Sequence, residues 1–365
     1  LRLEANCGIE GDLTSHFELT RRAPFATRLP VLVALALVAV KLWLVSAQPL
    51  RALGDARFDD EQFIRLAHAL LQGEWLGSYN NLTLARGPGY PLWIAFVSSL
   101  GLPLLTAQHL FYAFSCAVVA VAAAGWWPLR LPRLALFALL LANPMTFESA
   151  HLSRVIRQGI YPALTLLVVA ALLALAAPRP PGRRAQLLWA SLLGASGAAF
   201  WLTREEGLWL VPFVLPMAVV ALFRRRTDQG ALRQLLLALA LAVALFFALV
   251  AAAAQQNFRH YGSWVTAETS SRSFLDAYCA LTRVRPSVDL PTVAVTRDVR
   301  RAIYAQSPAF AEIRPYLEGG TALFWARLFE PFTGLDPKRR EIAGGAFAWA
   351  LRDSVQRAGH YSSPA

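Results

Sequence analysis

Residues 232–254 read LRQLLLALALAVALFFALVAAAA, an almost unbroken apolar run that carries a single charge, Arg233. A helix needs about 20 predominantly apolar residues to cross the hydrocarbon core of a bilayer, so this run predicts a transmembrane helix. The whole chain agrees, because 56% of its 365 residues are hydrophobic and only 16% are charged, against about 25% charged in soluble domains. We therefore expect an all-α polytopic membrane protein.

The same criterion, applied along the chain, predicts seven membrane spans. They cover residues 29–48, 104–127, 133–147, 160–177, 186–202, 207–223 and 232–254. The apolar stretch 91–101 (PLWIAFVSSLG) is too short to cross and predicts a helix lying at the membrane interface.

Arginine predicts the orientation of these spans. The segments that follow the second, fourth and sixth predicted spans carry several arginines, and Asp228 is the one acidic residue among them. Their arginines are Arg130 and Arg133, Arg179, Arg183 and Arg184, and Arg224, Arg225, Arg226 and Arg233, preceded near the N-terminus by Arg21, Arg22 and Arg28. Cytoplasmic loops carry such an excess, so residues 1–28 should be a cytoplasmic segment and 29–254 the membrane domain. The first loop, 49–103, and the tail, 255–365, should then be extracytoplasmic.

The tail is polar and mixed in composition, with apolar residues at helical spacing in GAFAWALRDSVQRAG (345–359), which predicts a small, mainly helical domain. It ends without a clear stop, which leaves open that the chain is a piece of a longer protein with further spans. Lysine occurs only at Lys41 and Lys338 against abundant arginine, a bias that points to a bacterial protein of the inner (plasma) membrane.

Several function classes receive no support from the sequence. The net charge of +12 comes from arginine clusters between apolar runs, which is a topology signal, so we expect no nucleic-acid partner. Cys7, Cys116 and Cys279 have neither metal-ligand spacing nor the pattern of a disulfide framework. Asp59-Asp60-Glu61 suits a hard cation, but no second acidic cluster of matching strength accompanies it. We expect neither a metal nor a cofactor.

The first loop carries the most unusual polar stretch, DARFDDEQFIRLAHALLQGEWLG (55–77). Phe63, Leu66, Ala67, Leu70 and Leu71 share one face of a predicted helix. Asp59 would cap this helix, with Gln62 completing a capping box. This structural interpretation explains one or two of the three acids and stays open beside a functional one. Further along, Arg86-Gly87-Pro88-Gly89 predicts a tight turn that presents one cation at the membrane surface.

The order of these elements resembles the first extracytoplasmic loop of the GT-C membrane glycosyltransferases. The branch in question contains the protein mannosyltransferases and the lipid A aminoarabinose transferase. Asp59 and Asp60 match its acidic pair, Phe63 stands where tyrosine is usual, and Arg86 with Pro88 matches its basic-proline turn. The segments RVIRQGIYPALTLL (154–167) and WLTREEGLWLVP (201–212) are similar to later parts of the same family.

The resemblance implies an inverting transfer of a sugar from a polyprenyl-phosphate carrier to a glycan, lipid or protein acceptor on the extracytoplasmic face. Asp59 would be the general base and Asp60 would orient the acceptor or Asp59 itself. Arg86 and Arg204 would hold the lipid phosphate, with Arg154 and Arg157 in reserve. Glu205 and Glu206 would bind sugar hydroxyls. Membrane lipids are the other expected partners.

Simpler interpretations of the same residues remain. Arg86 would snorkel to lipid headgroups, Arg204 would form a surface ion-pair cluster with Glu205 and Glu206, and Arg154 and Arg157 would anchor a helix end. Lys41, near the outer end of its span, should snorkel, His109 should pack with its aromatic neighbours, and Glu268 has no predicted role. Two rival functions also stay open, namely a transporter or flippase of a lipid-linked substrate and a non-catalytic membrane scaffold.

Overall fold

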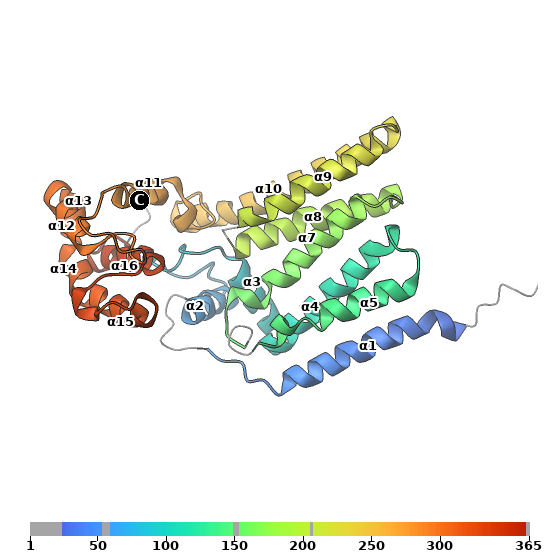
Figure 1. Ribbon diagram of the computed structural model, residues 1–365, viewed down its shortest axis with the longest axis horizontal. Helices are drawn as coiled ribbons and strands as arrows, with labels where there is room; N and C mark the ends of the chain where they lie inside the picture. Colours follow the sequence, from blue (N-terminus) through green and yellow to red (C-terminus); the bar gives the residue numbers. More distant parts are fainter. Residues whose placement is uncertain (1–23, 53–58, 149–152, 205–206, 363–365) are drawn as a thin grey trace, which may run out of the picture.

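The computed structural model describes residues 24–52, 59–148, 153–204 and 207–362. Within these ranges the chain forms helices and connecting loops and no strand; the one β-type contact is an isolated bridge between Arg51 and Arg154. A bundle of long helices makes up one part of the molecule, and a cluster of shorter helices caps one end of it (Figure 1). The fold is therefore all-helical, as predicted.

Seven helices form the bundle, and each contacts its neighbours in a continuous series. α4 contacts α1, α5 and α7; α8 contacts α7 and α10; and α9 contacts α7 and α10. Their bounds are α1 (Pro24–Ser46), α4 (Leu104–Ala122), α5 (Arg130–Leu141), α7 (Tyr161–Leu175), α8 (Arg183–Thr203), α9 (Val211–Arg225) and α10 (Gln229–Tyr261).

Five helical segments are long and apolar enough to cross a membrane: Arg28–Ser46, Leu104–Gly125, Arg183–Thr203, Gly207–Arg225 and Gln229–Tyr261. α5 and α7 are shorter, about 18 and 22 Å at 1.5 Å per residue, against a hydrocarbon core of about 30 Å. The structure thus has the character of a multi-pass helical membrane protein. The predicted count of seven spans is not confirmed, because the predicted spans 133–147 and 160–177 correspond to these two short helices.

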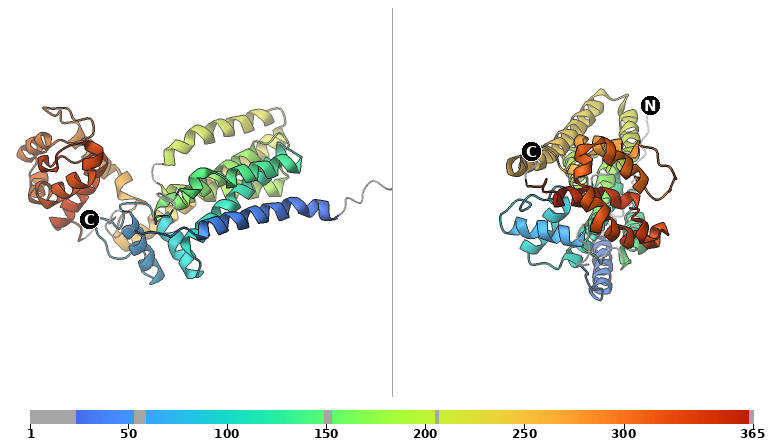
Figure 2. Two further views of the ribbon diagram at one scale, coloured as in Figure 1. Left: turned by 60° about the horizontal axis from the view of Figure 1, so that its bottom comes forward. Right: turned by 90° about the vertical axis from the view of Figure 1, so that its left-hand side faces the viewer.

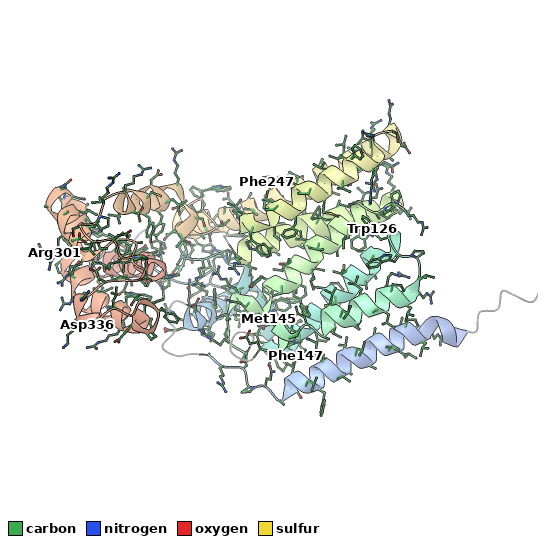
Figure 3. All side chains as sticks on the ribbon, in the orientation of Figure 1. Trp126, Met145, Phe147, Phe247, Arg301 and Asp336 are labelled. Atoms are coloured by element: carbon green, nitrogen blue, oxygen red, sulfur yellow. The ribbon has the colours of Figure 1, made fainter. Side chains whose placement is uncertain are left out.

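Small residues set the spacing of the central pair, α8 and α10. Ala190, Ala238 and Ala242 are buried at their contact, and a Cβ added to Gly194 would lie 2.4 Å from the carbonyl oxygen of Ala242. Without water to drive association inside a bilayer, helices pack where small residues let their backbones approach. The outward faces carry large exposed apolar side chains instead, such as Trp43 of α1 and Phe247 of α10, which suits contact with lipid; Phe247 is labelled in Figure 3.

The two ends of the bundle differ in charge. α4, α7 and α9 end, and α5, α8 and α10 begin, at the end farther from the C-terminal helices (Figures 1 and 2). The predicted cytoplasmic arginines that the structure describes, Arg28 and those between residues 130 and 233, therefore gather there. Arg224 illustrates the arrangement, since it donates to the carbonyl oxygen of Ala176 at 2.8 Å and lies over the ring of Trp126 at 4.5 Å.

Two short helices stand at the opposite end. α2 (Asp60–Leu71) buries Phe63, Leu66 and Ala67 on one face, which confirms the predicted helix, although Leu71, assigned to the same face, is exposed. α3 (Gly89–Ser99) confirms a short helix in place of a span. It contacts α2, α4 and α8, so it joins the loop to the bundle.

The C-terminal part is helical, as expected. It contains α11 (Arg272–Thr282), α12 (Arg297–Gln306), α13 (Pro308–Glu312), α14 (Arg314–Tyr316), α15 (Ala322–Thr333) and α16 (Gly344–Arg357). Leu317, Ile342 and Phe347 lie in its own apolar core. This part is called the tail domain below.

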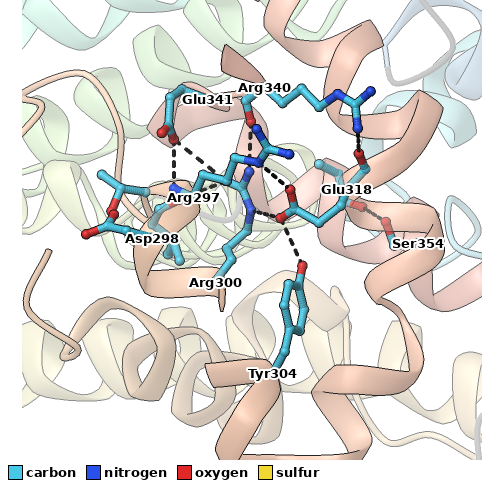
Figure 4. Close-up of polar contacts among 11 residues, drawn as sticks. Arg297, Asp298, Arg300, Tyr304, Glu318, Arg340, Glu341 and Ser354 are labelled. Atoms are coloured by element: carbon cyan, nitrogen blue, oxygen red, sulfur yellow. Dashed lines mark hydrogen bonds and ion pairs between the residues drawn. The ribbon is translucent and has the colours of Figure 1, made fainter. Parts of the chain in front are cut away.

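An ion-pair network within the tail domain joins α12 to Glu318 and to the backbone of Arg340 (Figure 4). The fully buried Arg300 donates to Glu318 at 2.6 Å and to the carbonyl oxygen of Arg340 at 2.7 Å. Arg297 and Tyr304 also donate to Glu318, at 2.9 and 3.1 Å. One carboxylate thus satisfies three side chains from α12.

Candidate active site

Asp59 and Arg86 form the first of two ion pairs at the tail-domain end of the bundle. Their Oδ1 and Nη1 atoms lie 2.6 Å apart, with the Arg86 side chain mostly buried and the Asp59 side chain partly exposed. The Arg86 guanidinium also lies 5.6 Å from the ring centroid of Phe63 and 5.0 Å from that of Trp349. Arg86 is therefore enclosed by protein groups, which contradicts the interpretation that it extends to lipid headgroups.

Asp60 and Arg154 form the second pair. Asp60 is fully buried, and its Oδ2 accepts from Nη2 of Arg154 at 2.5 Å. The strand-like contact of Arg51 with residues 153–155 fixes the Arg154 backbone, since Arg51 N donates to Ser153 O at 2.6 Å and Val155 N donates to Arg51 O at 3.2 Å. Arg154 thus contacts the acidic pair and is not a free membrane anchor. Asp59, Asp60, Arg86 and Arg154 are called the carboxylate–arginine cluster below.

The capping role predicted for Asp59 is wrong. Asp59 stands at the N-cap position of α2, but its side chain makes no capping hydrogen bond and faces Arg86 instead. Gln62, the expected partner in a capping box, donates to the carbonyl oxygen of Leu82 at 2.7 Å. Charge attraction to a buried guanidinium outweighs the weaker bond to a helix amide.

Glycine allows the Arg86 turn to lie against the end of α8. A Cβ at Gly87 would be 2.2 Å from the carbonyl oxygen of Leu202, and one at Gly89 would be 2.5 Å from Oγ1 of Thr203. The two segments singled out in the sequence, 86–89 and 201–204, are therefore in direct contact. This close approach needs residues without a side chain.

The remaining predicted site residues divide into three groups. Arg204 ends α8, and its guanidinium lies 4.8 Å from the ring centroid of Tyr161. Arg157 approaches the carbonyl oxygen of Thr203 at 3.5 Å, beside Arg204. Glu205 and Glu206 lie outside the described residues, so their predicted ion pairs and sugar contacts stay predictions.

The tail domain holds the loop that leads to Arg86, a role that the sequence did not reveal. Arg352 of α16 donates from Nε and Nη2 to the carbonyl oxygen of Asn81, at 2.9 and 2.6 Å. The same guanidinium pairs with Glu268 at 2.8 Å, and Glu268 accepts from the hydroxyl of Tyr79 at 2.5 Å. Burial and this hydrogen bond raise the pKa of Tyr79. Glu268 thus has a structural explanation: it joins the first loop to the tail domain.

A cavity of about 310 Å³ opens near the cluster, between the first turns of α4 and α7, the end of α8 and the segment 143–148. Of the predicted site residues, Arg204 borders it, whereas Asp59, Asp60, Arg86 and Arg154 do not. His109, expected to pack with aromatic residues, lines this cavity. Met145 and Phe147 mark the segment in Figure 3.

Lys41 is buried beside this cavity, so the prediction that it snorkels is wrong. It is 3% exposed, and its Nζ donates to Leu141 O at 2.9 Å and to Thr146 Oγ1 at 2.6 Å. The Phe147 ring centroid lies 4.0 Å away. α5 ends near Lys41, and the Leu141 carbonyl, which has no partner within the helix at this end, provides a buried acceptor.

A chain of contacts connects the cluster with the cavity. Arg86 lies over Phe63, the Phe63 ring packs edge-on against Tyr90 with centroids 5.1 Å apart, and the Tyr90 hydroxyl accepts from Gln108 Nε2 at 3.0 Å. Gln108 lines the cavity. Two aromatic side chains therefore stand between the cluster and the cavity.

Within the described ranges, no three His, Cys, Asp or Glu side chains gather closely enough to hold a metal ion. The chemistry of the cluster is that of carboxylates and guanidinium groups: proton transfer and the binding of anions. Comparison with known proteins adds no assignment, because no family model, curated protein or solved structure matches the chain.

Proposed function

We propose that the protein is a membrane glycosyltransferase that transfers a sugar from a polyprenyl-phosphate carrier to a hydroxyl acceptor at the tail-domain end of the bundle. The contact between Asp59 and Arg86 carries this proposal. A carboxylate and a guanidinium 2.6 Å apart supply the two groups that the reaction needs, a proton acceptor and a ligand for phosphate. The resemblance to the GT-C glycosyltransferases supports the same assignment.

The reaction is a single displacement with inversion. The acceptor hydroxyl attacks the anomeric carbon while its proton passes to Asp59. The bond between that carbon and the phosphate oxygen breaks, and the electron pair leaves with polyprenyl phosphate. Arg86, with Arg204, neutralises the charge that grows on the departing phosphate.

The resting ion pair gives this reaction an order. A phosphate that binds the Arg86 guanidinium shares its positive charge with Asp59, which meets Arg86 through Nη1. Binding of the carrier thereby weakens the attraction between Arg86 and Asp59, and the Asp59 carboxylate becomes available to the acceptor. Asp60, held by Arg154, fixes the start of α2 and so positions Asp59. Arg157 supports Arg204, and Glu205 and Glu206 bind sugar hydroxyls.

The membrane arrangement is part of the proposal. We place the protein in a bacterial inner membrane with seven spans, a cytoplasmic N-terminus and an extracytoplasmic tail domain. The gathering of arginines at the end away from the tail domain supports this orientation. α5 and α7 would then cross the membrane where the bilayer is locally thinned. Alternatively, the loop residues that flank each helix would complete the span.

Transport of a lipid-linked substrate is the main alternative. Transporters commonly place ionisable groups near the bilayer midplane. Lys41 is a buried charge of α1, but its Nζ already donates to Leu141 O and Thr146 Oγ1 within the protein. These hydrogen bonds favour a structural role for Lys41, and the ion pairs of the carboxylate–arginine cluster favour chemistry at the end of the bundle.

The experiment uses purified protein in proteoliposomes that contain a bacterial polyprenyl-phosphate-sugar pool labelled with ³²P. Release of labelled polyprenyl phosphate, dependent on an added acceptor fraction, is the expected result. Movement of intact carrier between leaflets without release would establish the transporter alternative. Neither release nor movement would contradict both and favour the scaffold.

A further inference from the structure

The cavity beside the cluster has the size and lining of a small-molecule site. Its volume of about 310 Å³ lies at the lower end of the range of about 300–1,000 Å³ found for ligand pockets. It is formed by segments far apart in the sequence, which meet where α4 and α7 begin and α8 ends. A cavity at this joint is accessible from the tail-domain end of the bundle, where Met145 on its rim is exposed.

The lining is rich in groups that both donate and accept hydrogen bonds. Gln108, Asn143 and Gln158 contribute amides, and His109 and Tyr161 contribute an imidazole and a phenol. Amides and hydroxyls in such numbers match a ligand that carries several hydroxyl groups, each able to donate and accept. An aliphatic chain would leave Gln108 Oε1 without a hydrogen-bond donor.

Gln108 provides the most specific indication. It is 3% exposed, and its Nε2 is engaged by the Tyr90 hydroxyl. Its Oε1 is buried, and no group in the described part of the chain donates to it. This oxygen is near Gly159, another lining residue, at which a Cβ would come within 2.2 Å of it. A buried carbonyl oxygen at the wall of a cavity is an acceptor for a ligand hydroxyl, which would take the place of water there.

The charges at the cavity favour a ligand without net charge. Arg204 and Glu148 both border it and have opposite signs. Two further cations lie close by: Lys41 donates to Thr146 and to the carbonyl oxygen of Leu141, and Arg157 donates to the carbonyl oxygen of Thr203. An anion would meet Glu148, and a cation would meet Arg204.

We propose that this cavity binds a neutral monosaccharide unit, with Gln108 Oε1 accepting a hydrogen bond from a sugar hydroxyl. The proposal deepens the glycosyl-transfer assignment, on which its biological meaning rests, but the binding itself does not require transfer. The chain of contacts through Tyr90 and Phe63 connects the cavity with the carboxylate–arginine cluster, and neither Asp59 nor Arg86 borders the cavity. The sugar belongs either to the carrier or to the acceptor.

The test measures binding of free methyl glycosides of neutral hexoses and pentoses to the purified full-length protein in nanodiscs, by saturation-transfer difference NMR. We expect at least one neutral glycoside to bind and the corresponding uronic acid to compete poorly. Gln108→Leu should weaken this binding about tenfold, the effect of one lost hydrogen bond to a buried acceptor. Competition by a polyprenyl-phosphate sugar would identify the carrier as the source, and competition only by an acceptor extract would identify the acceptor.

Gln186→Leu is the matched control. Gln186 is also 3% exposed with a buried Oε1 that lacks a donor in the described residues, but it lies at the start of α8 and does not border the cavity. Its substitution should leave glycoside binding unchanged. Gln158→Leu, on a loop of the cavity wall, gives a second variant that does not disturb a long helix.

Three results would overturn the proposal: no glycoside binds the parent protein, the Gln108 and Gln158 variants bind as the parent does, or Gln186→Leu loses binding equally. Failure of the transferase assignment looks different. In that case glycosides bind and Gln108→Leu weakens their binding, but the protein releases no polyprenyl phosphate. Binding that persists in Asp59→Asn would separate the cavity from the catalytic base.

Discussion

The Arg352 guanidinium donates two hydrogen bonds to the carbonyl oxygen of Asn81, from Nε at 2.9 Å and from Nη2 at 2.6 Å. The two residues are 271 positions apart in the chain. Arg352 is 2% exposed and pairs at the same time with Glu268. Asn81 also donates its backbone N–H to Gln356, one turn further along α16. The tail domain therefore fixes the backbone of the loop five residues before Arg86.

Arg352→Ala should cut turnover and also lower stability, because Asn81 O and Glu268 both lose their buried partner. Loss of the bidentate contact leaves the loop free to shift, and a misplacement of about 1 Å at a reacting group can cost about a hundredfold in rate. Arg352→Lys should fall between parent and alanine variant, because lysine has no planar fork. Hydrogen exchange of residues 79–90, measured beside polyprenyl-phosphate release, reports the loosened loop.

The control for this experiment is Arg272→Ala, which removes an arginine from a fully exposed ion pair with Asp276. It should change neither exchange nor turnover. Equal exchange in the parent and Arg352→Ala would show that the tail domain does not hold the loop.

Gly89→Ala should disturb the contact between the Arg86 turn and α8. The new Cβ would lie 2.5 Å from Thr203 Oγ1 and 2.7 Å from backbone atoms of Leu202 and Thr203, so the turn must move. Such overpacking typically costs about 1–3 kcal/mol, and we expect a clear loss of turnover. Gly345→Ala in α16, where nothing lies within 4 Å of the added Cβ, is the matched control. Turnover in Gly89→Ala equal to that of the control would argue against a functional need for this contact.

Lys41→Met should destabilise the bundle. Methionine keeps much of the length of lysine but leaves Leu141 O and Thr146 without their donor. An unsatisfied buried polar group costs about 1–3 kcal/mol, which thermal unfolding in detergent should detect as a lower Tm. Lys338→Met, at the exposed second lysine of the chain, should melt like the parent. An unchanged Tm for Lys41→Met would mean that the buried ammonium contributes nothing.

Glu318→Gln should weaken the tail domain in a pH-dependent way. Burial opposes ionisation of Glu318, but hydrogen bonds from Arg300 and Arg297 outweigh it and hold the pKa of this carboxyl below its ordinary value. A depressed pKa stabilises the fold above the ordinary glutamate pKa, and this stabilisation is lost as pH falls through the folded-state value. Removing one partner of a buried ion pair costs about 3–5 kcal/mol.

Hydrogen exchange of residues 295–357 between about pH 7 and pH 4, in the parent and in Glu318→Gln, measures this effect after correction for intrinsic exchange rates. The difference in protection between the two proteins should shrink as pH falls. Glu330→Gln, at an exposed position of α15, should show no difference at any pH. A constant difference across the range would contradict a depressed pKa for Glu318.

Much of the architecture follows from local pattern alone. The run 232–254 lies within α10, and the spacing of Phe63, Leu66 and Ala67 correctly predicts the buried face of α2, because apolar periodicity and burial are directly linked. The length of α5 was predicted less well. Apolar composition continues to residue 147, but the helix ends at Leu141, before Asn143-Pro144, where the residue preceding proline disfavours helical geometry.

The candidate site is less predictable because it is made by contacts between distant segments. The sequence marks Asp59, Asp60, Arg86 and Arg154 as unusual charges, but not that Asp60 meets Arg154 across 94 positions. The wrong predictions for Asp59 and Lys41 have one origin. A local rule, helix capping or snorkelling, was applied where a tertiary partner, Arg86 or the end of α5, lies closer. The sequence around Gln108 does not mark it as a binding residue, because its proposed role depends on a cavity that only the folded chain forms.

The central claim is that Asp59 takes the proton from the acceptor hydroxyl. The most direct test is to measure how fast the Asp59→Asn variant releases polyprenyl phosphate. Asparagine keeps the shape of the side chain but has no useful basicity, so turnover should fall by about 10²- to 10⁴-fold with an unchanged Tm. Asp276→Asn, at an exposed aspartate of α11, should retain parental turnover. Parental turnover in Asp59→Asn would contradict the assignment of Asp59 as the base.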